Sequence, residues 1–181
     1  MSPNIPTVDR HRALVLLRHA KSDYPYGVAD HDRPLAARGI REAALAGDWI
    51  RANLTGASAV DAVLCSTATR TRQTLQCTGI TAPVQHVDGI YDSTPGAVID
   101  EIHGVQSLFT GDITTLLVVG HEPVMSSLAI NLANNETRNS AIAQEIATKF
   151  PTSSIALLRT PQPWDQLALG SAELAAFHIA R

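Results

Sequence analysis

Residues 14–22 read LVLLRHAKS, so four consecutive apolar residues lead directly into Arg18 and His19. A short, continuous apolar run of this kind is typical of a strand that is buried on both faces of a parallel sheet. A strand that ends in a permanent cation and a titratable ring can simply have reached solvent. The alternative is that Arg18 and His19 bind an anion at this strand end. Residues elsewhere in the chain help to decide between these two interpretations.

Further apolar runs follow the first one, and segments with helical periodicity separate them. Strands are expected at residues 13–17, 60–64, 83–87, 116–119 and 154–158, with a last one at an edge over 173–179. Helices are expected from Asp32 to about residue 54, from Ser66 or Thr67 to Gly79, and over 94–107 and 123–134. Alternating strands and helices predict an α/β fold: a three-layer α/β/α architecture around a mainly parallel mixed sheet.

The composition excludes several classes of protein. The chain has 181 residues, of which 45% are hydrophobic, so it can bury a sizeable core. Fourteen basic and seventeen acidic residues give a net charge of −3, and no run of like charges occurs. Nucleic-acid-binding domains normally carry a basic stripe, and its absence here predicts no nucleic-acid partner. Any anion that this chain binds is expected to be small and held locally.

The remaining global features predict a cytoplasmic protein without a membrane partner. The first twelve residues contain no apolar signal core, and no later stretch is long enough to span a bilayer. The two cysteines, Cys65 and Cys77, form neither a disulfide framework nor a metal-binding motif. We expect residues 1–12 to be a flexible tail and residues 13–181 to be a single domain.

Charged and titratable residues follow three of the expected strands. Arg18 and His19 end the first strand, Arg70 follows the second, and His121 follows the fourth within a Gly-His-Glu-Pro turn. In open α/β sheets, ligands collect beyond the carboxyl ends of the strands, where helix starts also offer free N–H groups. Arginine forks match phosphate oxygens in a bidentate manner. The sequence therefore predicts a phosphate site built from these four residues.

Five stretches, in this order and spacing, carry a resemblance to a known family: LVLLRHAKS, DHDRPLAARG, STATRTRQT, VGHEP and FPTSSIALL. They resemble the histidine phosphatase superfamily, and within it the SixA-like phosphohistidine phosphatases. The resemblance implies a phosphoglycerate mutase-like fold and phosphoryl transfer through a phosphorylated histidine, without a metal or another cofactor. It makes His19 the nucleophile, while Arg18, Arg70 and His121 hold the phosphoryl group. Ala20 stands where the commonest motif has Gly, which favours the SixA-like branch and predicts that Ala20 avoids a positive φ.

The chemistry of a histidine nucleophile sets requirements on its surroundings. The imidazole must be neutral to attack phosphorus, and the flanking arginines are expected to lower the pKa of His19. The same arginines stabilise the charge on the equatorial oxygens of the phosphoryl group. One ring nitrogen attacks while a backbone carbonyl is expected to hold the other. Water then hydrolyses the phosphohistidine.

The sequence does not identify a single residue as the proton donor to the leaving group. Many members of the superfamily use an acid from the loop after the third strand, where Asp92 is the best match. Asp23 and Glu122 are alternatives, although Glu122 also fits the cap of its helix. A phosphohistidine substrate relaxes the requirement, so the absence of a dedicated acid is equally compatible with the sequence. Arg33 fits the rim of the site or an ion pair with Asp30 or Asp32.

The leading hypothesis is a metal-independent phosphatase that acts on a phosphorylated protein or a small phosphorylated substrate. No segment is large enough to form a separate lid, which fits a site open to a protein side chain. A mutase is less compatible, because the chain lacks room for the insertions of those enzymes. The alternatives are a phosphatase of small phosphoesters, a phosphate-binding regulatory module without turnover, and an interaction domain whose strand-end charges are solvated.

Overall fold

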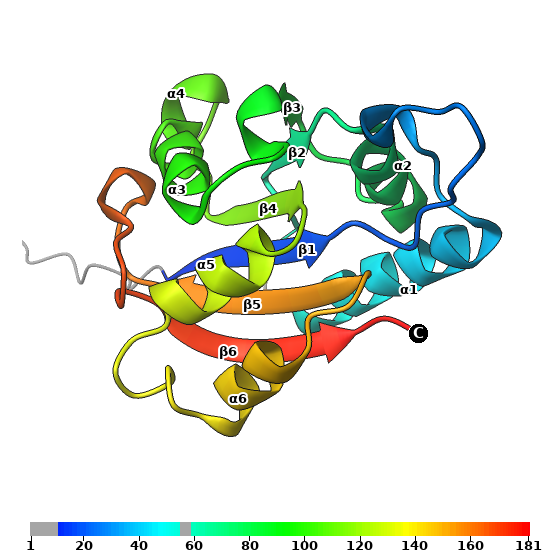
Figure 1. Ribbon diagram of the computed structural model, residues 1–181. Coiled ribbons are helices and arrows are strands. Elements are labelled where there is room, and N and C mark those ends of the chain that lie inside the picture. Colours follow the sequence, from blue (N-terminus) through cyan, green and yellow to red (C-terminus); the bar gives the residue numbers. More distant parts are fainter. Residues whose placement is uncertain (1–10, 55–58) are drawn as a thin grey trace, which may run out of the picture.

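The apolar runs of the sequence form the strands of one sheet, seen in a computed structural model that describes residues 11–54 and 59–181 (Figure 1). The strands are β1 (Arg12–Arg18), β2 (Ala62–Ser66), β3 (Val84–Val87), β4 (Thr115–Gly120), β5 (Ser154–Thr160) and β6 (Glu173–Ile179). Most of the expected tail, residues 1–10, lies outside the described residues. The last strand has the predicted bounds and lies at an edge.

The topology brings the ends of four strands to one side of the molecule. The strand order is β3-β2-β4-β1-β5-β6. The neighbours among β1 to β4 pair in parallel, whereas β5 and β6 run antiparallel. The carboxyl ends of β1, β2, β3 and β4 therefore share one edge of the sheet. This arrangement confirms the predicted mixed, mainly parallel sheet.

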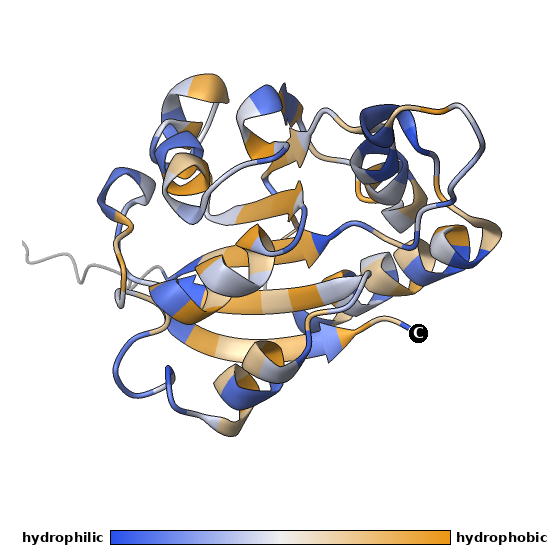
Figure 2. Ribbon diagram, viewed as in Figure 1, coloured by the Kyte–Doolittle hydropathy of each residue, from blue (hydrophilic) through white to orange (hydrophobic). Residues whose placement is uncertain are grey.

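Helices cover both faces of this sheet and complete the three layers. They are α1 (Ala37–Asn53), α2 (Thr69–Thr78), α3 (Pro95–His103), α4 (Val105–Leu108), α5 (Val124–Leu132) and α6 (Ala141–Thr148). Alternate residues of β1 enter opposite cores: Leu14 and Leu16 pack with α3 to α6, and Val15 and Leu17 pack with α1 and α2. The central strands β1, β2, β4 and β5 are accordingly mostly apolar and buried, while the helices carry polar outer faces (Figure 2). Among the described residues, no helix has the length and hydropathy needed to cross a membrane.

Two predicted helix starts are wrong, and long-range pairing explains one of them. Asp32 lies in a short 3-10 turn, η1 (Asp30–Asp32), and α1 begins only at Ala37. The intervening segment is extended because Leu35 bridges to Ser22 and the amide of Ala36 donates to the Lys21 carbonyl (2.9 Å). The segment is thus tied to the loop that follows β1, which is incompatible with helix.

The second helix also starts later than expected. Its N-cap is Ala68, because the hydroxyls of Ser66 and Thr67 are used elsewhere. The predicted end is correct: Gly79 follows α2 in the left-handed region, with φ 68°. The helix expected over 94–107 divides at Gly104 into α3 and α4, and α6 was not anticipated.

Candidate active site

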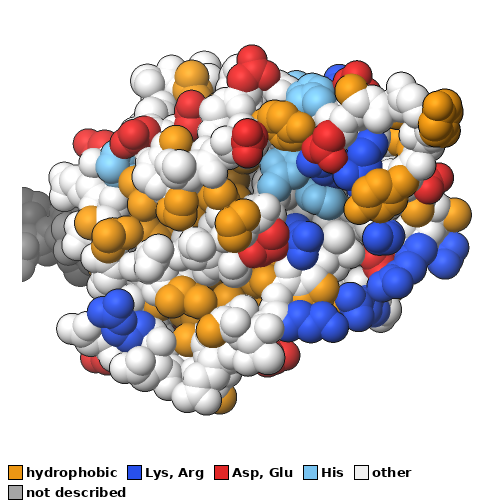
Figure 3. All heavy atoms as spheres, in the orientation of Figure 1, with side chains coloured by type: hydrophobic (Ala, Val, Ile, Leu, Met, Phe, Trp, Pro, Cys, Tyr) orange, Lys and Arg blue, Asp and Glu red, His pale blue; other side chains and the backbone are white. Residues whose placement is uncertain are grey.

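The four residues predicted to bind phosphate meet at the carboxyl-end edge of the sheet. In the register of β1 and β4, Arg18 lies opposite Gly120, and the amide of His19 donates to the Gly120 carbonyl (3.0 Å). A histidine directly follows each of these two strands, and the ring centres of His19 and His121 are 5.2 Å apart. Figure 3 shows histidine side chains gathered there, with basic and acidic side chains beside them.

His19 is held through one of its two ring nitrogens. Its Nδ1 lies 2.8 Å from the carbonyl of Ala20, which requires the proton on Nδ1 and leaves Nε2 unprotonated in the neutral ring. Within the described part of the chain, Nε2 makes no hydrogen bond. Ala20 is fully buried and is not among the residues with positive φ, as predicted. The carbonyl that fixes the ring is therefore set by the backbone directly after β1.

The pKa of His19 is lowered to about 3. The largest cause is burial, which disfavours the imidazolium form. The hydrogen bond to Ala20 opposes this effect, and the nearby His121, Arg70 and Arg18 lower the pKa further. The direction agrees with the prediction from the sequence, but the arginines are a smaller cause than desolvation.

His121 is oriented by a hydroxyl on one side and a guanidinium on the other. Its Nδ1 lies 3.3 Å from Nη2 of Arg70, and its Nε2 lies 2.8 Å from the hydroxyl of Ser66. A guanidinium can only donate, so Nδ1 accepts and the Nε2 proton points to Ser66. Burial, followed by the charge of Arg70, lowers the pKa of His121 to about 4. Arg70 thus fixes the tautomer of His121, and Ser66, which the sequence assigned only to a helix cap, accepts the Nε2 proton and orients the ring.

The two arginines are positioned by different means. Nη1 of Arg18 donates to the carbonyl of Phe150 (2.7 Å), and burial lowers the pKa of its guanidinium. Nε of Arg18 is buried and has no partner among the described residues. Arg70, in the first turn of α2, is buried and donates to Asp30 twice: Nη1 to the backbone carbonyl (2.6 Å) and Nη2 to the carboxylate (3.0 Å).

Asp30 is the main residue of this cluster that sequence reasoning did not assign to it. Besides Arg70, its carboxylate accepts from Nη1 of Arg33 (2.6 Å) and from the hydroxyl of Tyr91 (3.0 Å). Burial alone would raise the pKa of Asp30, but the bonds from Arg33 and Tyr91 and the charge of Arg70 outweigh it, so the pKa falls to about 2. The expected ion pair of Arg33 with Asp30 is present. This pair was the only feature of the sequence analysis that pointed to a role for Asp30.

None of the three predicted proton donors joins the cluster through a hydrogen bond or ion pair in the described residues. Asp92 is exposed at φ 48°, and its side chain makes neither contact. The carboxylate of Asp23 accepts from the amide of Tyr24 (2.8 Å). Glu122 accepts from the amide (3.0 Å) and hydroxyl (2.6 Å) of Ser126, so it caps α5. In the loop after β3, Tyr91 rather than Asp92 faces the cluster, with its ring 5.5 Å from that of His121.

Two histidines and two arginines at parallel strand ends define a class of phosphoryl-transfer protein, and comparison with known families agrees. The chain belongs to the Histidine phosphatase superfamily (branch 1), whose family model matches residues 14–157. This match confirms the predicted family and, with the sheet described above, the predicted phosphoglycerate mutase-like fold.

The relatives point to the SixA-like branch. An uncharacterised protein of Mycobacterium tuberculosis is 58% identical over 166 residues, which cover 91% of this chain and 100% of that protein. The structure of a protein from Nakamurella multipartitia, assigned as phosphohistidine phosphatase SixA, has a TM-score of 0.82 and 38% identity over 93% of this chain and 95% of its own. A similarly assigned structure from Agrobacterium tumefaciens has a TM-score of 0.70 and 25% identity over 92% and 97%.

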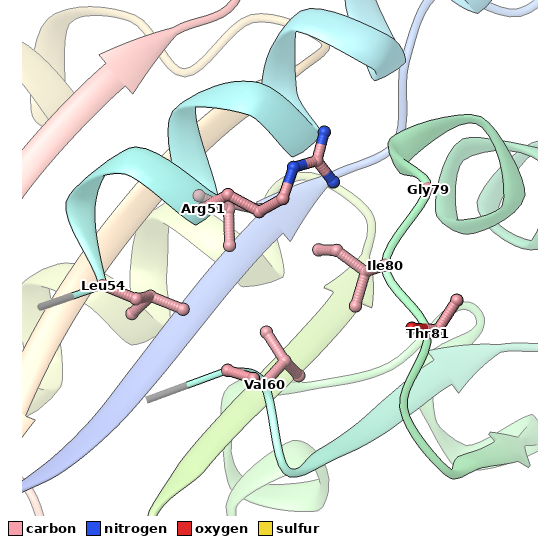
Figure 4. Close-up of a pocket in the computed structure, with 8 residues that line it drawn as sticks. Arg51, Leu54, Val60, Gly79, Ile80 and Thr81 are labelled. Atoms are coloured by element: carbon pink, nitrogen blue, oxygen red, sulfur yellow. The ribbon is translucent and has the colours of Figure 1, made fainter. Parts of the chain in front are cut away.

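A hollow of about 260 Å³ lies away from this cluster, where the end of α1 meets the segment after α2 (Figure 4). Leu54, Val60 and Ile80 contribute apolar walls. Its cation, Arg51, is already engaged by the Thr78 carbonyl (2.8 Å) and by Asp48. The hollow contains none of the residues predicted to bind phosphate, so it is separate from the histidine and arginine cluster.

Proposed function

We propose that this protein is a metal-independent phosphatase that removes phosphoryl groups from phosphohistidine in proteins, with His19 as the nucleophile. The observation that carries the proposal is the geometry of His19: the Ala20 carbonyl holds Nδ1, and Nε2 makes no hydrogen bond in the described residues. Burial, helped by the charges of the neighbouring His121, Arg70 and Arg18, lowers the pKa of this ring and favours the neutral form. The likeness to proteins assigned as SixA supports the choice of phosphohistidine as substrate.

In the first step, Nε2 of His19 attacks phosphorus and the P–N bond to the substrate imidazole breaks. The substrate ring leaves with the electron pair of that bond and takes a proton from water. Arg18 and Arg70 neutralise the oxygens of the transferring group, which is the largest contribution that such a site can make. His121 binds a further oxygen through Nδ1 when it is protonated in the complex.

In the second step, water attacks the phosphohistidine on His19, inorganic phosphate leaves, and neutral His19 is restored. The hydrogen bond between Nδ1 and the Ala20 carbonyl keeps the ring in one orientation through both steps. No carboxylic acid is assigned to either step. Imidazole is a better leaving group than an alkoxide, so a site in which no carboxylic acid is assigned as proton donor fits phosphohistidine better than an alkyl phosphate.

The test compares His19→Ala with His86→Ala, a control at an exposed histidine of β3. His19→Ala should abolish turnover of a phosphohistidine peptide and still bind inorganic phosphate, whereas His86→Ala should behave as the unmodified protein. Labelled substrate should leave an acid-labile, base-stable phosphoryl group on His19 in a rapid-quench experiment. Turnover that survives in His19→Ala would refute the assignment of the nucleophile.

A substrate panel separates this proposal from its alternatives. The panel contains a phosphohistidine peptide, sugar phosphates, nucleotides and an aryl phosphate. A phosphohistidine phosphatase should prefer the peptide by at least about 100-fold in kcat/KM, a difference of roughly 2.7 kcal/mol. Comparable rates on all substrates would indicate a phosphatase of small phosphoesters. Binding of phosphate without turnover of any substrate would indicate a phosphate-binding module.

A further inference from the structure

Three arginines line one hollow of about 340 Å³ on the outer side of α1. Arg38 and Arg41 come from the first turns of α1, Arg181 follows β6, and Glu42 and Leu45 complete the lining. Glu42 is buried, and its carboxylate is taken by Nε of Arg38 (2.5 Å) and approached by the hydroxyl of Ser153 (3.5 Å). Arg41 and Arg181 form no ion pair within residues 11–54 and 59–181. With Arg38 paired to Glu42, the hollow therefore carries the positive charge of Arg41, with which no carboxylate of the described residues pairs.

Ser153 connects the hollow to His19, because it contacts both His19 and Glu42. The amide of Ser153 donates to the carbonyl of His19 (3.2 Å), and the hydroxyl of the same residue approaches Glu42. On the other side, a Cβ on Gly39 would collide with the backbone of Lys21, which is two residues past His19. An extended chain advances about 3.4 Å per residue, so the residues that flank a phosphohistidine bound at His19 can extend toward this hollow.

The charge around the site is opposite to that of the whole chain. The protein has a net charge of −3, yet a band of Lys and Arg side chains runs from the histidine cluster along this face (Figure 3). Beside the band, the exposed ring of Tyr24 is covered by the guanidinium of Arg33, 3.5 Å from the ring centre, and Tyr26 is fully exposed. Arginine and tyrosine are enriched where proteins contact one another. A protein partner with acidic residues fits this face best.

We propose that the arginine-lined hollow binds an acidic segment that flanks the phosphohistidine of a protein substrate. This inference rests on the proposed function, because it assumes that a protein side chain enters the site at His19. Arginine forks pair with carboxylates in a bidentate manner, and exposed complementary charges mainly raise the rate of encounter. The hollow thereby selects among phosphohistidine proteins by the sequence around the modified residue.

The kinetic test uses two histidine peptides phosphorylated with phosphoramidate, one flanked by four Glu residues and the other by four Gln residues. The readout is the ratio of kcat/KM for the two peptides, which cancels any general effect of a variant on folding or chemistry. We expect a ratio of about 10 in favour of the Glu peptide, decreasing at high salt. Arg41→Glu should bring the ratio to one or below, and Arg41→Gln should give an intermediate value.

The matched control is Arg138→Glu, an equivalent charge reversal at an exposed arginine without an ion pair in the described residues, far from α1 in sequence. It should leave the ratio of the unmodified protein unchanged. A ratio of one in the unmodified protein, or a ratio that Arg41→Glu and Arg138→Glu reduce equally, would overturn the docking proposal while leaving the proposed function intact.

A binding measurement decides the proposal independently of turnover. Fluorescence anisotropy of the unphosphorylated Glu peptide should show binding that is at least fivefold weaker in Arg41→Glu than in Arg138→Glu. If neither phosphorylated peptide is hydrolysed, the proposed function fails, and this difference alone still supports the acidic docking site. Absence of the difference overturns it. Tighter Arg41-dependent binding of a single-stranded oligonucleotide would also overturn the assignment to an acidic protein segment.

Discussion

The protonation of His19 follows from its burial, and this makes the pH dependence of the reaction predictable. An exposed histidine is half protonated near pH 6.5, whereas the pKa of His19 is lowered to about 3 and that of His121 to about 4. Both rings of the free protein should therefore stay neutral throughout the range from pH 5 to 8. The profile of kcat/KM should show no loss of activity from His19 as the pH falls through 6.5, measured with a substrate whose charge is constant there.

Nuclear magnetic resonance gives the direct measurement for this prediction. The ¹⁵N shifts of the two rings, assigned through His19→Gln and His121→Gln, should show Nδ1–H for His19 and Nε2–H for His121. Neither set of shifts should titrate above pH 5. A midpoint near 6.5 for His19 would contradict both the burial argument and the assignment of a neutral nucleophile.

The contacts of Asp30 predict a positioning role for this residue. Its carboxylate and carbonyl hold both terminal nitrogens of Arg70, so Asp30→Ala should loosen the guanidinium and reduce kcat/KM about tenfold or more. The affinity for inorganic phosphate should fall in parallel, as measured by competitive inhibition. Asp30→Asn keeps one acceptor oxygen and should recover part of the loss. Asp32→Ala, at an exposed carboxylate in the same turn, is the control and should change kcat/KM little.

The position of Asp92 predicts that its carboxylate is dispensable. The side chain is exposed and makes no hydrogen bond or ion pair in the described chain, and its φ of 48° is one that Asn tolerates well. Asp92→Asn should therefore change kcat less than about twofold on a phosphohistidine peptide and on an alkyl phosphate alike. Selective slowing of the alkyl phosphate would instead show that Asp92 donates a proton to poor leaving groups.

At the scale of elements, α1 lies in close contact with the backbone of the loop after β1, two residues past His19. Gly39 allows this approach, since any Cβ would collide with the carbonyl of Lys21. Gly39→Ala should lower the free energy of unfolding by about 1–3 kcal/mol, because neither backbone can yield without moving Ala20 or α1. Activity should fall as well, since the Ala20 carbonyl orients His19.

Gly96 provides the control for this substitution, because it lies in the first turn of α3 and a Cβ there would meet only the Thr94 hydroxyl, at 4.0 Å. Gly96→Ala should raise the free energy of unfolding by about 0.5–1 kcal/mol through helix propensity and a less flexible unfolded chain. Urea unfolding of both variants measures the difference. Equal effects of the two substitutions would show that α1 can move away from Lys21 at little cost.

For the molecule as a whole, the features that depend on local sequence pattern could be predicted, whereas the features that depend on contacts between distant residues could not. Strand ends were predictable because buried parallel strands are nearly all apolar, and their common edge then placed Arg18, His19, Arg70 and His121 together. The place of Asp30 in the site could not be predicted, because its partners Arg70 and Tyr91 are 40 and 61 residues away in the chain. The late start of α1 has the same origin, in the pairing of Leu35 with Ser22 across a loop.

The two buried histidines also tie the stability of the whole fold to pH. In the unfolded chain each ring has a pKa near 6.5, whereas in the fold the values are about 3 and about 4. Below pH 6.5 the unfolded state therefore binds protons that the folded state does not, and stability is lost as the pH falls. The loss approaches about 1.4 kcal/mol per pH unit for each ring, so both together cost several kcal/mol well above pH 4.

This loss is large against a total stability of roughly 5–15 kcal/mol, so the protein should unfold at moderately acidic pH. The low pKa of Asp30, about 2, adds to the loss only below its ordinary value of 3.8. Urea unfolding at pH 7 and pH 5 should show the decline, and it should be about halved in His19→Gln, which removes one of the two proton-linked groups. His86→Gln, at an exposed ring, should retain the full decline. The same slope in all three proteins would mean that the buried rings are protonated in the fold, which is incompatible with a neutral His19 at the site.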